Sequence, residues 1–375
     1  MFNKFFKGIM KRYLKFIALF SIGFIIISCQ EKDDDKIDDI DLPTTYSFDN
    51  VDYSGQTERL NQATEIINLV KTANTGAKLD ENVLLDMYKN VNGNGNGNFT
   101  FSSTKQLFDK TSPESQDLLI SYFKELANVS GTTEVAESGK AGIIATGTRS
   151  VLVNANGQEY KELIEKGLMA AVFLHQISNV YLSPDKMNVD NITNVEGKNY
   201  TTMEHHWDEA FGYLGATTLW PTDATDQRFW AKYSRKSGAD ITNGKIDTPS
   251  DITKAFIKGR DAIKRKDYTE RDKQITEVNK QLELIVATTA ISYLNGTITN
   301  FGDAAMRSHQ LSEAYGCIWG LNYINYLQRT ISKTEIDTLL EMLGTNFFEI
   351  TNDKLISTRN KLAEIYGLTD IKENF

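Results

Sequence analysis

Cysteine and proline are both scarce in this chain of 375 residues. The cysteines are Cys29 and Cys317. If Cys29 is modified near the N-terminus, Cys317 has no partner, so no intramolecular disulfide can form and a buried, unreactive thiol is expected. The chain contains five prolines. Because proline interrupts helices, this scarcity favours a helical fold.

Positive charge is also in deficit. Lysine and arginine number 41 against 50 aspartates and glutamates, which gives a net charge of −9. This balance argues against nucleic acids and anionic membrane surfaces as partners.

The common catalytic motifs are missing as well. The sequence has no G-x-S-x-G, no H-E-x-x-H and no phosphate-binding loop. Neither cysteine lies in a pattern typical of a catalytic nucleophile. A metallopeptidase would need an activated water and a general base, and the sequence identifies neither. An enzymatic activity therefore stays uncertain, and a binding role is preferred.

The N-terminus has the features of a bacterial lipoprotein precursor. A basic start precedes FIALFSIGFIII, an apolar run too short to span a bilayer comfortably. The following Ile-Ile-Ser-Cys resembles a lipobox, which predicts a signal peptide over 1–28 and lipidation of Cys29. An uncleaved anchor is the alternative. The acidic stretch over 29–45 is expected to be a disordered tether. Together with the signal peptide and the lipobox, it predicts an outer membrane lipoprotein that is periplasmic or surface-exposed.

Helical periodicity dominates the rest of the chain. Besides the repeat helices described below, helices are expected over 57–74, 81–91, 113–129, 160–182, 251–268, 271–298, 337–350 and 353–368. A short β-hairpin is expected around residues 150–157. These patterns predict an all-α helical domain over 46–375, built as two pseudo-symmetric bundles with halves at about 46–236 and 237–375. The basic face of the helix at 251–268 is expected to be solvated, with anion binding as the alternative; its residues are Lys258, Arg260, Lys264, Arg265 and Lys266.

An internal repeat motivates the two-bundle prediction. HHWDEAFGYLGA at 205–216 and HQLSEAYGCIWG at 309–320 share H-x-x-x-E-A-[FY]-G, followed by a small residue four places later. On a helix, the apolar positions of each copy form a core stripe, and the histidine, glutamate and glycine lie roughly opposite. Glycine inside a helix is unfavourable, so we expect a close approach to this second face by the other repeat helix or by a ligand.

The repeated histidine and glutamate are candidate metal ligands. Residues four apart project to the same side of a helix, and His/Glu sets on bundle helices hold iron or zinc. The candidate ligands are His205, His206, Glu209, His309 and Glu313, with His175 in reserve. One shared ion would require a steep helix crossing, so two separate sites are equally admissible. Alternatively, the pairs form a structural hydrogen-bond network, because buried polar groups need partners in any case.

Four stretches together resemble a family of Bacteroidota lipoproteins known only as a domain of unknown function: YSFDNVDYSGQTERLNQ, EHHWDEAFGYLGA, FIKGRDAIKRKDY and SHQLSEAYG. The acidic run after Cys29 is similar to the surface-export signal of such lipoproteins. The family in turn resembles imelysin-like proteins, two-bundle helical proteins of the periplasm or cell surface linked to iron uptake. Their hallmark is G-x-H-x-x-E. His206 and Glu209 match its H-x-x-E part, whereas Glu204 stands in place of the glycine.

Three functions are compatible with these observations. The first is a cell-envelope lipoprotein that binds iron or another metal for uptake through its His/Glu pairs. The second is a structural or partner-binding lipoprotein of an envelope uptake complex, in which the pairs serve packing alone. The third, implied by the resemblance, is an imelysin-type metallohydrolase.

Overall fold

The computed structural model describes residues 42–375, which form one compact unit. The predicted signal peptide, Cys29 and the tether up to residue 41 lie outside the described residues. In chain order, the helices are α1 (Ser54–Lys71), α2 (Glu81–Tyr88), α3 (Gln116–Val129), α4 (Tyr160–Leu168), α5 (Pro184–Met187), α6 (Thr202–Gly212), α7 (Phe229–Ser234), α8 (Ala239–Thr242), α9 (Thr248–Arg265), α10 (Tyr268–Thr299), α11 (Ala304–Gly320), α12 (Lys333–Leu343) and α13 (Asn352–Ile365). The predicted all-α fold is confirmed.

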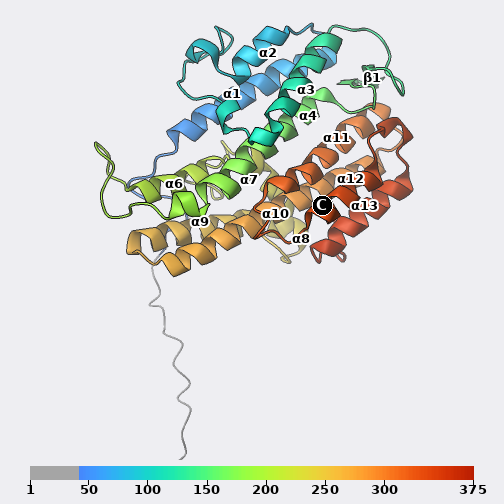
Figure 1. The fold of residues 1–375 in the computed structure, drawn as a ribbon. Helices are drawn as coiled ribbons and strands as arrows, with labels where there is room; N and C mark the ends of the chain where they lie inside the picture. Colours follow the sequence, from blue (N-terminus) through green and yellow to red (C-terminus); the bar gives the residue numbers. More distant parts are fainter. Residues whose placement is uncertain (1–41) are drawn as a thin grey trace, which may run out of the picture. The chain divides into compact units, whose positions relative to one another are not determined.

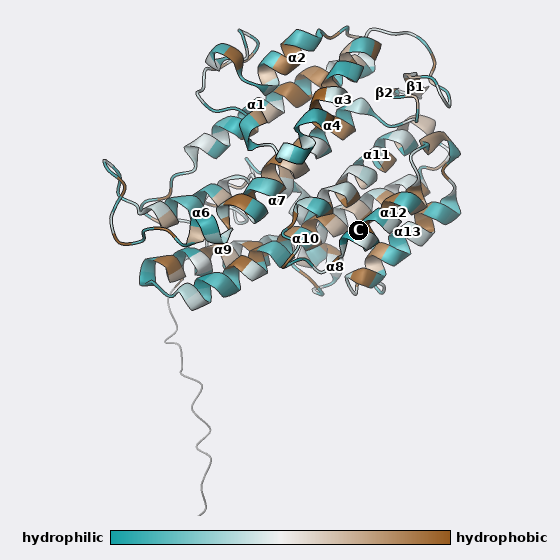
Figure 2. Ribbon diagram, in the orientation of Figure 1, coloured by the Kyte–Doolittle hydropathy of each residue, from teal (hydrophilic) through white to brown (hydrophobic). Residues whose placement is uncertain are grey.

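The arrangement centres on α10, which packs against α9, α11 and α13. In turn, α11 contacts α4, and α4 joins α1 and α3 (Figure 1). Apolar side chains concentrate where the helices face one another, whereas polar residues cover their outer faces (Figure 2). One cluster of buried apolar residues extends from Tyr46 to Ile371, and therefore includes residues of both predicted halves. The described helices include none that is long and apolar enough to cross a membrane.

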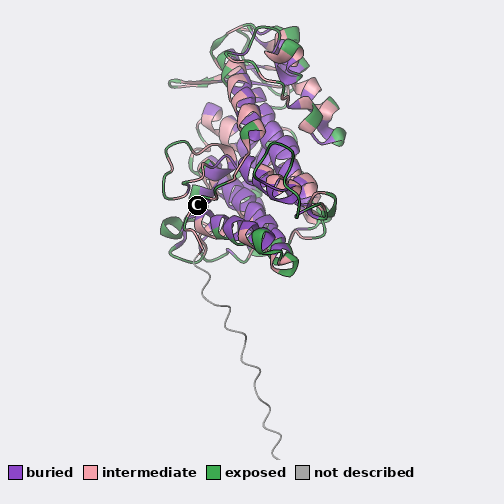
Figure 3. Ribbon diagram, turned by 90° about the vertical axis from the view of Figure 1, so that its left-hand side faces the viewer, coloured by how far each residue is buried: buried purple, intermediate pink, exposed green. Residues whose placement is uncertain are grey.

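The chain segment after α4 stays helical but widens. Met169–Leu174 and Gln176–Tyr181 form π-helical turns that continue α4 to the end of the predicted helix at 160–182. Every residue from Met169 to Leu174 is buried. Figure 3 shows that the buried positions run along helices through the middle of the molecule, while exposed positions gather at outer turns. The Met169–Leu174 segment is therefore enclosed by protein.

The small β-hairpin lies earlier than predicted. Strands β1 (Gly142–Thr146) and β2 (Arg149–Val153) pair antiparallel, with Gly142 opposite Val153. The turn between them contains Gly147 in the left-handed conformation, at φ +57°. Residues 154–157 instead form a turn in which the Asn154 side chain accepts a hydrogen bond from the Asn156 amide. The predicted hairpin at 150–157 overlaps β2, but the strand that pairs with β2 precedes it in the chain instead of following it.

The two repeat stretches form helices of different extent. Capping sets their starts: Thr201 and Glu204 make a reciprocal capping box at α6, and the Asp303 side chain caps α11. Although the second stretch is helical to Gly320, α6 ends at Gly212. Gly215 is left-handed at φ +85° and pairs through its carbonyl with the Arg228 amide, so the chain leaves the helix there. The expectation of a helix through residue 216 was wrong.

The predicted apolar stripes are buried in both copies. Trp207, Ala210, Phe211 and Leu214 are fully buried. In the second copy Leu311, Ala314 and Ile318 are fully buried, and Tyr315 is half-buried against the core. The Trp207 indole donates to the Phe256 carbonyl of α9 at 3.0 Å. Its ring also lies on Gly259, where an added Cβ would come within 2.0 Å.

Replacing Gly259 with alanine should therefore destabilise the fold. Alanine favours a helix, but its methyl group would collide with the fully buried Trp207 ring, and overpacking of this kind costs about 1–3 kcal/mol. Gly302→Ala is the matched control, since nothing lies within 4 Å of a Cβ there. We expect Gly259→Ala to lower the thermal unfolding midpoint and Gly302→Ala to leave it nearly unchanged. Equal midpoints for the two variants would contradict the packing of Trp207 on α9.

Candidate metal centre

The second repeat helix places His309 and Glu313 one turn apart on α11, facing α4. His309 Nε2 lies 3.4 Å from Glu313 Oε2, as the spacing predicts. On the facing segment, Glu159 and Glu162 precede and open α4, and both are buried. The Glu159 amide donates to the Ser312 hydroxyl at 2.8 Å, which fixes the start of α4 against α11.

The imidazole of His309 lies between carboxylates. Its Nδ1 is 2.7 Å from Glu159 Oε2 and 3.3 Å from Glu162 Oε1. The other carboxylate oxygen of Glu159, Oε1, accepts a hydrogen bond from the side-chain amide of Asn74 at 2.7 Å. About a fifth of the His309 side chain is exposed, so the cluster has one partly solvent-accessible edge.

A buried lysine holds the same carboxylates from the other side. The Lys166 ammonium donates to Glu162 and Glu313, each at 3.1 Å, and to the Tyr233 hydroxyl at 2.9 Å. Only 1% of the Lys166 side chain is exposed. Burial opposes its charge, but the carboxylates and Tyr233 around it outweigh burial and hold its pKa well above the ordinary value. This ion network joins α4 to α11 and extends to α7 through Tyr233.

The repeated glycine of the second copy makes room for that lysine. A Cβ at Gly316 would lie 2.6 Å from Lys166 Cβ. In the first copy, a Cβ at Gly212 would lie 2.6 Å from Tyr53 Cβ and 2.9 Å from Gln56 Cβ. The close approach expected at the repeat glycines is therefore present, but it comes from α4 in one copy and from the start of α1 in the other. The suggestion that the two repeat helices approach each other at these glycines was wrong.

Negative charge exceeds positive charge in the cluster when His309 is neutral. Four carboxylates, Glu159, Glu162, Glu165 and Glu313, surround two ammonium groups, Lys161 and Lys166. Burial would raise the pKa of Glu165, but Lys166 and Lys161 lower it to about 2, so Glu165 is ionised. Burial raises the pKa of Glu162 despite Lys166. With all four carboxylates ionised the excess is two negative charges, which a divalent cation at His309 would balance.

The cluster offers a ligand set for such a cation. One oxygen each of Glu159 and Glu162 and one nitrogen of His309 lie within 4.8 Å of one another. Within residues 42–375, no other group of three or more histidine, cysteine or carboxylate ligands comes this close. Imidazole and carboxylate donors suit zinc and divalent iron. A metal ion bound through Nδ1 would take the place of the proton that His309 shares with Glu159.

The first repeat copy has a different environment. His205 stacks on the Tyr200 ring, with centroids 4.7 Å apart, and its Nε2 is 3.9 Å from Glu209. Glu209 accepts hydrogen bonds from Gln56 at 2.9 Å and from Tyr181 at 3.0 Å. His206 instead contacts the Lys186 carbonyl through Nδ1 at 2.9 Å. Glu209, Gln56 and Tyr181 form a hydrogen-bonded network, His206 bonds separately to the backbone, and no three metal ligands converge.

The structure therefore separates the five predicted ligands. His309 and Glu313 lie together with two glutamates that the motif analysis had not singled out. His205, His206 and Glu209 lie on α6 against other elements, chiefly α1 and the π-helical segment. His175 is half-buried within that segment, and burial lowers its pKa.

The buried ion pairs of Arg260 were not predicted from the sequence. They contradict the expectation that Arg260 lies on a solvated basic face. Arg260, expected on a solvated basic face, is fully buried in α9. It donates to Asp208 at 3.0 Å, to Glu204 at 2.7 Å and to Asn50 at 2.8 Å. Burial raises the pKa of Asp208 to about 6, although Arg260 and a hydrogen bond from Tyr46 oppose the shift. Arg260 is four residues after Phe256 and three before Ile263, so the helical period places it with the core residues.

Cys317 is buried and inert, as predicted. Burial raises the pKa of its thiol to about 12, so the reactive thiolate is scarce at neutral pH.

The His309 imidazole should titrate at higher pH than an ordinary histidine. Burial favours the neutral ring, but the hydrogen bond to Glu159 and the charges of Glu162 and Glu313 outweigh it and raise its pKa above 6.5. We expect the His309 resonance to titrate above pH 6.5 in NMR, and Glu159→Gln to lower that midpoint. His175 provides the internal comparison, since burial lowers its pKa. Titration of His309 below His175 would contradict the ion cluster.

The same shift makes part of the folding stability depend on pH. The folded-state pKa of His309 exceeds the unfolded value of about 6.5. Its contribution is therefore complete below pH 6.5 and is lost as the pH rises through the folded-state pKa. The difference in unfolding free energy between the wild type and His309→Gln should shrink over that interval. The measurement is chemical denaturation from pH 5 to pH 9; a difference that grows with pH would reverse the assignment.

Comparison with known proteins gives one match. The family model described as "Domain of unknown function (DUF4856)" matches residues 43–369. No curated protein and no solved structure matches the chain. The matched segment contains both repeat stretches, the carboxylate cluster around His309 and the Arg260 ion pair.

Proposed function

Because the chain belongs to the DUF4856 family, whose description assigns no activity, we propose a function from the geometry of its ion cluster and from its N-terminal sequence. We propose a cell-envelope lipoprotein that binds iron or zinc and serves as a binding component in metal uptake. The ligands are Glu159, Glu162 and His309, with Glu313 beside them. Lipid on Cys29 would attach the protein to the outer membrane, where envelope uptake proteins would be its partners.

One observation carries the metal proposal: three ligand atoms from two different segments converge within 4.8 Å. Two of those ligands are buried carboxylates, which are costly to bury unless a cation accompanies them. Lys161 and Lys166 supply only part of the compensating charge. His309 supplies one further positive charge when protonated, whereas a divalent ion would supply two and so balance the four carboxylates when the imidazole is neutral.

The resemblance to imelysin-like proteins gives independent support. It points to helix-borne histidine and glutamate ligands and to a Bacteroidota cell envelope. In this chain the H-x-x-E match lies in the first copy, where His206 and Glu209 bond to separate partners. Glu204, which replaces the imelysin glycine, caps α6 and binds Arg260. We therefore place the strongest metal centre in the second copy and retain an internal duplication, with halves at about 46–236 and 237–375, as the origin of both.

The structural alternative has its own observation. The Lys166 ammonium already binds Glu162 and Glu313, so the cluster can be stable without a metal ion. The pairs on α6 and α11 would then fix helix packing in a lipoprotein that binds a protein partner. A metallohydrolase is the weakest of the three, because the carboxylates beside His309 are buried and hydrogen-bonded, which leaves little room for an activated water.

Metal content separates these functions. Residues 31–375 would be expressed without the lipid cysteine and purified without chelator or histidine tag. We expect near-stoichiometric iron, zinc or manganese by mass spectrometry, falling to background in the Glu159→Gln, Glu162→Gln double variant. His205→Gln with Glu209→Gln is the matched control and should retain the metal. Because a metal competes with the proton on His309, affinity in a zinc titration should rise from pH 6 to pH 8.

Two results would overturn the assignment. Wild-type protein that neither carries nor binds metal, with a double variant that is merely less stable, would make the cluster a packing device. Metal lost from the His205 and Glu209 variant but kept by the Glu159 and Glu162 variant would move the centre to the first copy.

A further inference from the structure

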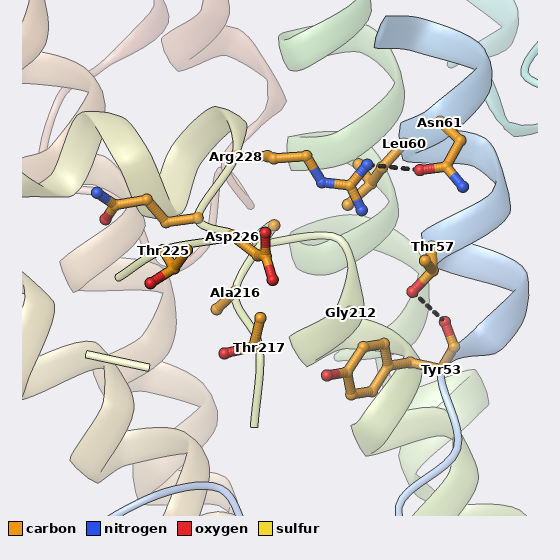
Figure 4. A pocket seen from close by; sticks show the side chains of 12 residues that line it. Tyr53, Thr57, Leu60, Asn61, Gly212, Ala216, Thr217, Thr225, Asp226 and Arg228 are labelled. Carbon is orange, nitrogen blue, oxygen red and sulfur yellow. Dashed lines mark hydrogen bonds between the residues drawn. The ribbon is translucent and has the colours of Figure 1, made fainter. Parts of the chain in front are cut away.

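A polar pocket lies beside the first repeat helix, apart from the carboxylate cluster. Its volume is about 560 Å³, within the range of small-molecule sites. Its walls come from the start of α1, from the end of α6 and from the loop that joins α6 to α7 (Figure 4). None of the residues that line it is a proposed metal ligand.

Two residues of opposite charge line this pocket without a direct ion pair between them. Arg228 and Asp226 are neighbours on the loop, yet they form no ion pair, and the Asp226 carboxylate accepts no hydrogen bond from any residue of the described chain. The guanidinium is half-buried and extends toward Asn61 of α1, to which it donates at 2.6 Å (Figure 4). Burial lowers the pKa of Arg228, although the charge of Asp226 opposes the shift.

The loop backbone is fixed where it carries Arg228, whereas Asp226 is exposed. The Arg228 amide donates to the Gly215 carbonyl at 2.8 Å, and the Arg228 carbonyl lies so close to Gly215 that a Cβ there would be 2.3 Å away. Phe229, the next residue, has φ +46°, an unfavourable conformation for an aromatic residue. Its ring packs edge-on against Phe173, 5.0 Å away, which stabilises that backbone. The buried core thus preorganises the Arg228 side of the pocket.

The arrangement of donors and acceptors defines a ligand class. The remaining N–H groups of Arg228 match a carboxylate. Asp226 offers an unshared carboxylate that matches an ammonium group. Tyr53 and Ala216 add one aromatic and one small apolar side chain to the lining. Neutral polyols would use the hydroxyl groups of the pocket but would leave both charges uncompensated.

We propose that this pocket binds a small zwitterion of the amino-acid or short-peptide class. Arg228, positioned by Asn61, binds its carboxylate, and Asp226 binds its ammonium group. The site is independent of the metal centre, so a protein that failed to bind metal would leave it unaffected.

The test uses L-alanyl-L-alanine, its N-acetyl derivative and its C-terminal amide, titrated calorimetrically into residues 31–375, which contain the whole compact unit. We expect the free dipeptide to bind, and each blocked derivative to bind about tenfold more weakly, since each lacks one charge-assisted contact. Asp226→Asn should abolish discrimination against the N-acetyl derivative only. Arg228→Gln should abolish discrimination against the amide only.

This crossed pattern cannot arise from a general loss of structure, because each variant keeps one of the two preferences. The thermal midpoint of each variant provides the folding control. Equal binding of all three compounds to the wild type, or no binding of the free dipeptide up to 10 mM, roughly the upper range for such ligands, would overturn the proposal. Binding of neutral sugars in preference to the dipeptide would also overturn it.

Discussion

The buried ammonium of Lys166 is the interaction on which the centre of this structure depends. It lies between carboxylates of α4 and α11 and reaches Tyr233 of α7, so three elements distant in the sequence meet at one charge. Removing one partner from such a network leaves uncompensated charge in a medium of low dielectric constant, which is far more costly than the loss of one surface ion pair. The surrounding helices are therefore fixed in register as well as packed. Both the proposed metal ligands and their charge balance derive from this constraint.

The two repeat helices illustrate how one motif can serve two environments. In both copies the apolar stripe faces the core, and in both the histidine and glutamate lie one turn apart. Their neighbours differ: Gln56 and Tyr181 satisfy Glu209 with neutral donors, whereas Glu313 lies among ions. The motif determines which groups share a face of the helix. The facing segment determines their chemistry.

Features set by interactions between residues close in the sequence could be predicted, whereas features set by contacts between distant residues could not. Helical period and capping are local, so the all-α class, the long helix now seen at Tyr268–Thr299 and the buried stripes could be predicted. The ligand partners Glu159 and Glu162 come from a segment 150 residues away, and no pattern within the repeat indicates them. A signal existed, since Glu159, Glu162 and Glu165 recur every three residues at the start of a helix whose second half is apolar. Arg260 was also detectable from its spacing to Phe256 and Ile263, whereas the early end of α6 depends on a contact between Gly215 and Arg228.

The absence of a side chain at position 316 has an evolutionary consequence. The Lys166 side chain occupies the space that a Cβ at position 316 would fill, so the lysine fits there only while residue 316 is glycine. A lineage that acquires a larger residue at 316 must shorten or redirect the residue at 166, and would then have to neutralise or replace the glutamates that the ammonium serves. Substitutions at these positions should consequently be inherited as a set. Their joint presence or absence would divide the family into branches with and without the buried charge.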